Sequence, residues 1–330
     1  MTGVDDGVIL AVDGGGSKTD IVAIAPDGEL LAHLRGPSSS PQVLGWPRAL
    51  SVLESLRRSA LEAVHGRRVL ATHVYLSGLD LPVELAEAHD VLESWDAAVI
   101  DNDLFALLRA GTRSTDAVAV VCGTGINAIG VRADGATARF PAIGEISGDW
   151  GGGPFLGRKA LWFAARADDG RGEPTLLTKT VPAALGLDSV WAVTEALHFG
   201  RLGPETFSRL CPVLFETSDA GDVVAQSVVD TQALEIVLLA SAAINRLQLQ
   251  DVRVPVVLGG GVLASQNERL LAGVTTGLVE RAPHAEPVLV TSPPILGAGL
   301  AALETAGSDD DALERFRTMV LEQTWVAAGA

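Results

Sequence analysis

A glycine-rich turn between two apolar segments lies near the start of the chain, at residues 8–20 (V-I-L-A-V-D-G-G-G-S-K-T-D). The apolar run before the turn and the alternating run at residues 21–24 have the pattern of two β-strands. Three consecutive glycines remove the Cβ atoms at the bend, so positive φ angles are allowed and backbone N–H groups can approach an anion. The segment predicts a hairpin whose turn can hold a phosphate, although an ordinary glycine hairpin has the same pattern.

Two better-known phosphate loops do not fit this segment. A Walker A loop requires glycine directly before its lysine and a helix after it, but Ser17 precedes Lys18 and a strand-like run follows. A dinucleotide-binding turn also needs a helix, and a glycine where Thr19 stands. Asp13, at the end of the first strand, would face a hydrated Mg²⁺ ion, because a bare carboxylate and a phosphate repel each other.

Composition and charge narrow the possible partners. The chain has 330 residues, enough for two domains, and its 48% hydrophobic and 20% charged residues are typical of a folded protein. The formal net charge of −17 argues against nucleic acid and acidic membrane surfaces as partners. A bound nucleotide would have to be held by local groups and a metal ion.

The cysteines and the apolar segments point to a cytoplasmic protein. Cys122 and Cys211 are the only cysteines and form no CxxC pair, so neither a disulfide framework nor a zinc site is indicated. The N-terminal residues are acidic, and no uninterrupted apolar stretch reaches the roughly 18 residues of a membrane span. Secretion and membrane insertion are therefore not predicted.

The order of predicted elements occurs twice along the chain. A β-β-β-α-β-α-β-α pattern covers residues 8–110, and a similar pattern begins at residue 116 with a helical insertion at about 154–250. We expect an α/β protein with one domain at 1–114, completed by a final helix at about 309–330, and a second domain at 115–308. Such a duplication places a ligand cleft between two similar domains.

Three glycine turns fall at corresponding strand ends of the two copies, at residues 13–17, 123–125 and 259–261. The first two could hold the β- and γ-phosphates of a nucleotide through backbone N–H groups, and the third could lie against the adenosine. Thr124 adds a hydroxyl donor. The predicted ATP-binding residues are Asp13, Gly14, Gly15, Gly16, Ser17, Lys18, Thr19, Gly123, Thr124, Gly125, Gly260 and Gly261.

The segment D-N-D-L-F at residues 101–105 places acids where a strand ends and a helix begins. Phosphoryl transfer to an alcohol needs a carboxylate that accepts the hydroxyl proton, and Asp103 is the candidate base. Helix capping is an alternative role for Asp103. Asp101 still belongs to the strand and is the weaker candidate.

A second glycine-rich loop, residues 143–157, has six glycines in fifteen residues and includes Glu145 and Asp149. A carboxylate that accepts hydrogen bonds from two hydroxyl groups selects a sugar, so Asp149 is a candidate sugar ligand. Trp150 could stack on a pyranose ring or pack in the core, and the sequence leaves both roles open.

The combination of motifs resembles the N-acetylglucosamine kinases and BadF/BadG/BcrA/BcrD ATPases of the sugar kinase, heat-shock protein and actin superfamily. D-G-G-G-S-K-T-D and V-V-C-G-T-G-I-N-A resemble its two phosphate motifs, and V-V-L-G-G-G-V its adenosine motif. N-D-L-F-A-L-L-R-A-G is similar to the segment with the catalytic aspartate, and S-G-D-W-G-G-G-P-F-L-G to the sugar loop. The resemblance extends over residues 9–303.

The resemblance implies duplicated ribonuclease H-like, actin-like domains with mixed five-stranded sheets, flanking helices and a central cleft. It implies ATP and Mg²⁺ as cofactors, Asp103 as the base, and transfer of the γ-phosphate to the 6-hydroxyl of N-acetylglucosamine or a related sugar. The implied substrate-binding residues are Ser40, Asn102, Asp103, Asn127, Gly144 and Asp149. An asparagine that eukaryotic members use for the sugar falls near Ser40, and Trp150 stands where the family usually has glutamate. The identity of the sugar is therefore not determined.

Two alternative functions remain at this stage. One is a BadF-type ATPase that acts on a partner protein without a sugar, and the other is a sugar-binding regulator. The presence of Asp13, Asp103 and all three glycine turns favours an active enzyme over the regulator. The sequence also leaves open whether the chain forms a homodimer.

Overall fold

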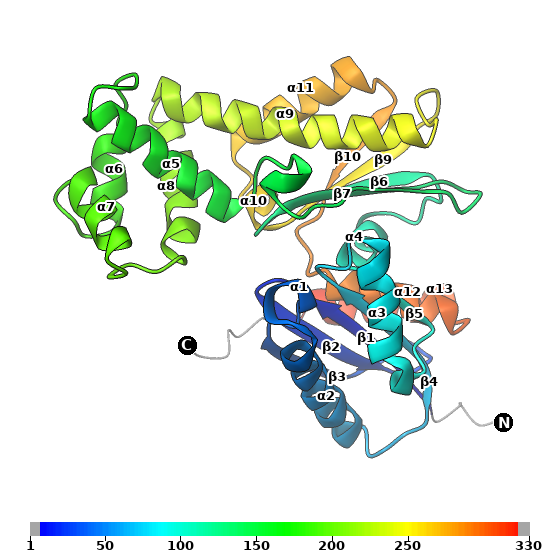
Figure 1. The fold of residues 1–330 in the computed structure, drawn as a ribbon. Coiled ribbons are helices and arrows are strands. Elements are labelled where there is room, and N and C mark those ends of the chain that lie inside the picture. The colour runs from blue at the N-terminus through cyan, green and yellow to red at the C-terminus, as the bar shows by residue number, and fades with distance from the viewer. Residues whose placement is uncertain (1–6, 323–330) are drawn as a thin grey trace. The chain divides into compact units, whose positions relative to one another are not determined.

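The computed structural model describes residues 7–322 and divides them into two compact units (Figure 1). Among the described residues, the first unit consists of 7–114 and 290–322, and the second is Thr115–Leu289. Each unit is built on one mixed sheet of five strands, flanked by helices. The duplicated α/β architecture predicted from the element order is confirmed.

The sheet of the first unit has the strand order β3-β2-β1-β4-β5. Its strands are β1 (Val8–Gly14), β2 (Lys18–Ile24), β3 (Leu30–Pro37), β4 (Val69–Leu76) and β5 (Val99–Asn102). β1 pairs antiparallel with β2 and parallel with β4, and β4 pairs parallel with β5. The carboxyl ends of β1, β4 and β5 therefore lie at the same edge of this sheet.

Helices cover both faces of this sheet. They are α1 (Pro41–Leu44), α2 (Trp46–Ala63), α3 (Pro82–Val91), the 3₁₀ turn η1 (Glu93–Trp95), α4 (Asp103–Gly111), α12 (Ile295–Thr305) and α13 (Asp310–Glu322). Alternate residues of β1 point to opposite faces, so Val12 packs with Leu53 of α2, while Ile9 packs with α12 and α13. β1 is buried along its whole length for this reason.

Residues 290–308 belong to the first unit, which corrects the domain boundary at 308 expected from the sequence. α12 packs against α4, β1 and β4. Gly297 allows this close approach, because a Cβ atom there would lie 1.8 Å from the carbonyl oxygen of Ala106. An apolar helix pattern shows that α12 must be buried, but not which of two similar sheets buries it.

The sheet of the second unit, in the order β10-β9-β6-β7-β8, repeats the arrangement of the first. β6 and β7 form the antiparallel hairpin, β8 extends it, and β9 and β10 add in parallel. The strands are β6 (Ala117–Cys122), β7 (Ile126–Val131), β8 (Thr137–Arg139), β9 (Val254–Gly259) and β10 (Ala285–Leu289). β6 thus corresponds to β1, and the turn after it corresponds to the first glycine turn.

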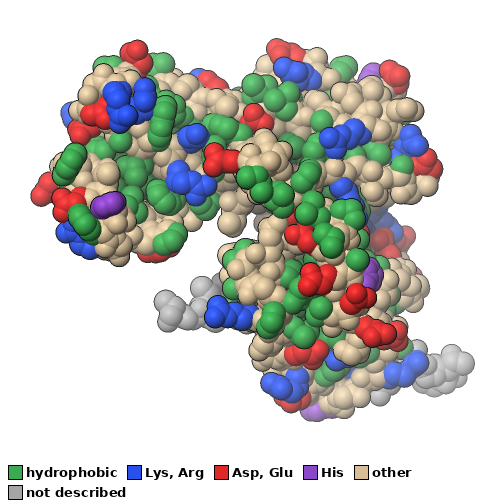
Figure 2. All heavy atoms as spheres, viewed as in Figure 1, with side chains coloured by type: hydrophobic (Ala, Val, Ile, Leu, Met, Phe, Trp, Pro, Cys, Tyr) green, Lys and Arg blue, Asp and Glu red, His purple; other side chains and the backbone are tan. Residues whose placement is uncertain are grey.

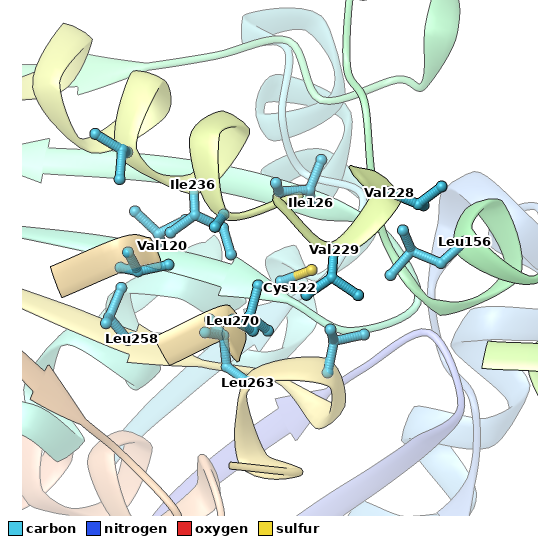
Figure 3. Close-up of a cluster of buried hydrophobic side chains, with 14 of the residues drawn as sticks. Val120, Cys122, Ile126, Leu156, Val228, Val229, Ile236, Leu258, Leu263 and Leu270 are labelled. Atoms are coloured by element: carbon cyan, nitrogen blue, oxygen red, sulfur yellow. The ribbon is translucent and has the colours of Figure 1, made fainter. Parts of the chain in front are cut away.

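The helical insertion begins after β8. The helices of this unit are η2 (Glu145–Ser147), α5 (Gly153–Asp168), α6 (Leu177–Ala184), α7 (Val190–His198), α8 (Thr206–Asp219), α9 (Val223–Arg246), α10 (Gly261–Ala264) and α11 (Glu268–Arg281). Figure 3 shows the core where side chains of α9, Val229 and Ile236, meet Val120 and Cys122 of β6. The insertion shares this core with the sheet.

α9 is the one helix within residues 7–322 that is long and apolar enough to cross a membrane by length and composition. Half of its most apolar window is buried inside the unit, as expected for a core helix. On the face drawn in Figure 2, lysine and arginine side chains are scattered among acidic and hydrophobic ones.

Candidate functional site

The first glycine turn joins β1 to β2 in the hairpin that the sequence predicted. The register pairs Gly14 with Thr19, and the N–H of Gly15 donates to the carbonyl oxygen of Lys18 at 2.9 Å. Neither Gly14 nor Gly15 has a left-handed φ, contrary to the expected use of glycine here. Gly14 is required by packing instead, because a Cβ atom there would lie 2.4 Å from Leu76 and 2.5 Å from Ser39.

The residues of this turn differ in how far they are exposed. Gly16 and Ser17 are exposed at the surface of the first unit. Thr19 is fully buried and its Oγ1 donates to Ser39 Oγ at 2.7 Å, while Ser38 Oγ donates to the carbonyl oxygen of Gly15 at 3.0 Å. The Thr19 side chain is therefore used in a buried hydrogen bond that stabilises the turn, and we assign it a structural role.

A buried ionic network lies behind the turn, at Asp20. Arg35 makes a bidentate hydrogen bond to its carboxylate at 2.8 and 3.1 Å, His33 Nε2 lies 3.2 Å from Oδ1, and Lys18 Nζ lies 3.5 Å from Oδ2. Burial alone would raise the pKa of Asp20, but the hydrogen bonds from His33 and Arg35 outweigh burial and lower it. Asp20 is therefore a charged structural residue.

Asp13 ends β1 and is 6% exposed. Burial, reinforced by the nearby charges of Asp103 and Asp20, holds the pKa of Asp13 well above its usual range. The positive charges of Lys18 and Arg35 act in the opposite direction without reversing the shift. Two carboxyl groups, those of Asp13 and Asp103, thus share one low-dielectric region, where a cation would favour their ionised forms.

Asp103 is the first residue of α4, and Asn102 is the N-cap: its Oδ1 accepts a hydrogen bond from the N–H of Leu104 at 2.9 Å. The alternative role of Asp103 as the cap is therefore not needed. Burial raises the pKa of Asp103 to about 6. Hydrogen bonds from the backbone N–H groups of Asp103 and Leu104 lower the pKa, but their effect is smaller than that of burial. A carboxylate with this pKa is suited to accept a proton near neutral pH.

Two of the predicted sugar ligands in this unit are engaged in the fold. The amide of Asn102 caps α4 and donates to Asp80 Oδ1 at 2.8 Å. Ser40 is 2% exposed and packs next to Gly78, where a Cβ atom would lie 3.1 Å from the Ser40 hydroxyl. Asn102 therefore uses its amide within the protein, and Ser40 is buried.

Ser77 is a polar residue at the same sheet edge that the sequence reasoning missed. It follows β4, and its N–H donates to the carbonyl oxygen of Gly14 at 2.8 Å. Its hydroxyl is buried and has no hydrogen-bond partner among residues 7–322. A polar residue directly after a buried parallel strand was the available signal, as for Asp103. Ser77 is a candidate for contact with the substrate.

In the second unit, two glycine turns lie next to each other. Thr124 and Gly125 are exposed in the turn between β6 and β7, and a Cβ atom on Gly125 would meet nothing within 4 Å. Gly260 has a φ of +92°, and a Cβ atom there would lie 2.5 Å from the carbonyl oxygen of Cys122. The turn after β9 is thus packed against the end of β6, while Gly261 faces open space.

The loop that carries Asp149 is ordered by that carboxylate. Asp149 Oδ2 accepts hydrogen bonds from the N–H of Gly144 at 2.9 Å and from Ser147 Oγ at 2.6 Å. Asn127 lies on β7, where its Oδ1 accepts from the N–H of Ala128 at 2.6 Å. Trp150 packs edge to face on Phe155 with ring centroids 4.9 Å apart, which favours the packing role over sugar stacking.

Comparison with known proteins gives a consistent picture. An N-acetyl-D-glucosamine kinase of Dictyostelium discoideum is 26% identical over 323 residues, covering 90% of this chain and 98% of the relative. An N-acetylmuramic acid/N-acetylglucosamine kinase of Clostridium acetobutylicum is 26% identical over 269 residues, covering 78% and 86%.

A solved structure from Chromobacterium violaceum, described as a candidate N-acetylglucosamine kinase, has a TM-score of 0.66 and 24% identity. The match covers 90% of this chain and 98% of that one. This likeness shows that the two chains share a fold. The model of the BadF/BadG/BcrA/BcrD ATPase family matches residues 10–302. The chain therefore belongs to the BadF/BadG/BcrA/BcrD ATPase family.

Proposed function

We propose that this protein is an ATP-dependent kinase that phosphorylates the 6-hydroxyl group of N-acetylglucosamine or a closely related amino sugar. The observation that carries the proposal is Asp103, a carboxyl group with a pKa of about 6 at the start of α4, which leaves helix capping to Asn102. Family membership and the two curated kinases support the same reaction.

In the proposed reaction, the oxygen of the sugar hydroxyl forms a bond to the γ-phosphorus of ATP, and Asp103 accepts the proton of that hydroxyl. The bond between that phosphorus and the β–γ bridging oxygen breaks, and ADP leaves. The exposed turn residues Gly16, Ser17 and Thr124 bind the phosphates through N–H and hydroxyl groups. Gly261 lies against the adenosine, and Asp149 binds sugar hydroxyls.

A magnesium ion fits the residues that are present. Residues 7–322 contain no cluster of three or more metal-binding side chains, whereas Asp13 is a buried carboxyl group beside a second one, Asp103. Mg²⁺ usually keeps several waters and binds one or two carboxylates together with substrate phosphates. We propose that Asp13 holds the ion through water. When bound, the ion would neutralise phosphate charge.

A panel of hexoses and amino sugars, incubated with ATP and analysed by product mass, tests the proposal. We expect phosphorylation of N-acetylglucosamine, loss of product on chelation of Mg²⁺, and ADP release that depends on the sugar. ADP release that is independent of every sugar would contradict the proposal and favour an ATPase that acts on a partner protein. We also propose a cytoplasmic location, because ATP is the donor and both cysteines are free thiols.

A further inference from the structure

A glutamine lies in the apolar core of the second unit, in the middle of α9. Gln232 is 0% exposed, and residues on the same part of the helix, Val228, Val229 and Ile236, belong to the core in Figure 3. Burial of an amide costs free energy unless its donor and acceptor are both hydrogen-bonded. Packing alone does not account for a glutamine at this position.

The carbonyl oxygen of this amide, Oε1, lies against two glycines, Gly151 and Gly152. Gln232 Oε1 accepts a hydrogen bond from the N–H of Gly152 at 3.3 Å. A Cβ atom on Gly151 would lie 2.4 Å from the same Oε1, and one on Gly152 would lie 2.6 Å from the carbonyl oxygen of Thr124. Gly151 and Gly152 therefore fit between the Gln232 amide on one side and the phosphate turn on the other.

The donor end of the amide is unsatisfied. Gln232 Nε2 is buried and has no hydrogen-bond acceptor among residues 7–322. Turning the amide over does not solve this, because Nε2 would then face the N–H donor of Gly152. An unsatisfied buried donor lowers the stability of the fold. It lies beside Gly151, which has a φ of +139° and no side chain to block rotation of its peptide groups.

We propose that Gln232 is a positioning residue for the kinase reaction. Its Oε1 fixes Gly152, and its Nε2 donates to a backbone carbonyl oxygen of residues 150–152 that rotates towards it when sugar is bound. This inference rests on the proposed function. Because Gly152 follows the segment with Asp149, Gln232 sets how that carboxylate lies relative to Thr124. Small errors in the placement of reacting groups have large effects on rate.

The first experiment compares Q232M with Q226M. Methionine keeps the volume and the helix propensity of glutamine but removes both hydrogen-bonding groups. Gln226 is the matched control, because it lies on the same helix and donates to the carbonyl oxygen of Ser218 at 3.2 Å, away from the glycine pair. We expect Q232M to lower kcat/KM for the sugar by about 10- to 100-fold, mainly through KM, and Q226M to stay near the wild type.

Q232E separates the donor from the acceptor. A protonated glutamic acid keeps a hydrogen-bond donor and an acceptor, like the NH₂ and carbonyl groups of glutamine, whereas the carboxylate offers no donor. Burial raises the pKa of such an acid, so the activity of Q232E relative to the wild type should rise as pH falls. Asp103 titrates in both proteins and cancels in the ratio. Cys122 and Cys211 have pKa values raised to about 12 and 11 by burial and stay neutral.

Three results would overturn the inference. The first is Q232M kinetics equal to those of Q226M, which would reduce Gln232 to a packing residue. The second is a Q232E ratio that does not change with pH, which would mean that the Nε2 donor is not used. The third result is equal hydrogen exchange of residues 143–153 in Q232M and Q226M. This measurement is needed if the wild type phosphorylates no sugar, because the proposed function then fails and kinetics cannot test Gln232. Hydrogen exchange then decides: residues 143–153 must exchange faster in Q232M than in Q226M, and equal exchange refutes the role of Gln232.

Discussion

The backbone N–H of Gly153 donates a hydrogen bond to the carbonyl oxygen of Gly123 at 2.7 Å. This contact joins the start of α5 to the glycine turn between β6 and β7. Because the loop with Asp149 leads directly into Gly153, the loop proposed to bind sugar and the turn proposed to bind phosphate form one packed region of the second unit. Substitutions there should separate into those that disturb folding and those that disturb binding.

The glycines Gly260 and Gly261 provide such a separation. Gly260→Ala should lower the free energy of unfolding by about 3 kcal/mol or more, because of its φ of +92° and the contact of a Cβ atom with Cys122. Gly261→Ala meets nothing within 4 Å and should fold normally, but weaken ATP binding about tenfold, or about 1.4 kcal/mol. Urea unfolding and nucleotide titration measure the two effects. Equal unfolding free energies in the two variants would contradict this assignment.

Asp103→Asn should abolish transfer while ATP still binds. The amide keeps the size of the carboxyl group but accepts no proton, so we expect a loss of about 10²–10⁴ in kcat. Asp101→Asn is the matched control, since Asp101 lies two residues earlier on β5 and accepts from the N–H of Asn102 at 2.7 Å. A coupled kinase assay measures both variants. Turnover near that of the wild type in Asp103→Asn would exclude it as the base.

The pH dependence of the reaction should report the same carboxyl group. Asp103 must be ionised to accept a proton, and its pKa is raised to about 6 by burial. We therefore expect kcat/KM to fall about tenfold per pH unit below about pH 6 and to reach a plateau above it. A steady-state profile with one buffer series tests this. A profile that stays flat down to pH 4.5, roughly the range of an unperturbed carboxyl group, would contradict it.

Stability should respond to pH through the same residue. A carboxyl group with a raised pKa stabilises the fold at low pH, and this contribution is lost as pH rises through about 6. Asp103→Asn removes the buried charge, so its melting temperature should exceed that of the wild type above about pH 6, and the difference should shrink at lower pH. Differential scanning calorimetry at several pH values checks the sign.

The network at Asp20 should matter for stability more than any surface pair. Arg35→Met leaves a carboxylate with 1% side-chain exposure without its bidentate partner, and should cost about 2 kcal/mol. Arg35 itself is 32% exposed, which keeps this below the loss for a fully buried pair. Arg253→Met breaks the exposed pair with Glu286 and should change stability by less than about 0.5 kcal/mol. Denaturant unfolding compares the two variants.

Local patterns in the sequence were enough to predict several features. The alternation of apolar residues around 8–24 predicted the β1–β2 hairpin, and the repeated element order predicted two sheets of the same design. The acid after β5 pointed to Asp103. The hairpin and the two sheets are found in the structure because strand periodicity and glycine turns are properties of short segments, whereas the role of Asp103 stays a proposal.

Contacts between distant segments decided the rest. The sequence could not assign α12 to the first unit, because either sheet could bury an apolar helix. It gave Thr19 a phosphate-binding role, whereas the fold buries Thr19 against Ser39. It offered no reason to notice Gln232, whose importance depends on Gly152 lying beside it. The sequence by itself determined the strands, the turns and the acid at the start of α4. Only tertiary packing decided which polar groups are buried and which are hydrogen-bonded within the protein, because those contacts join segments that are distant in the sequence.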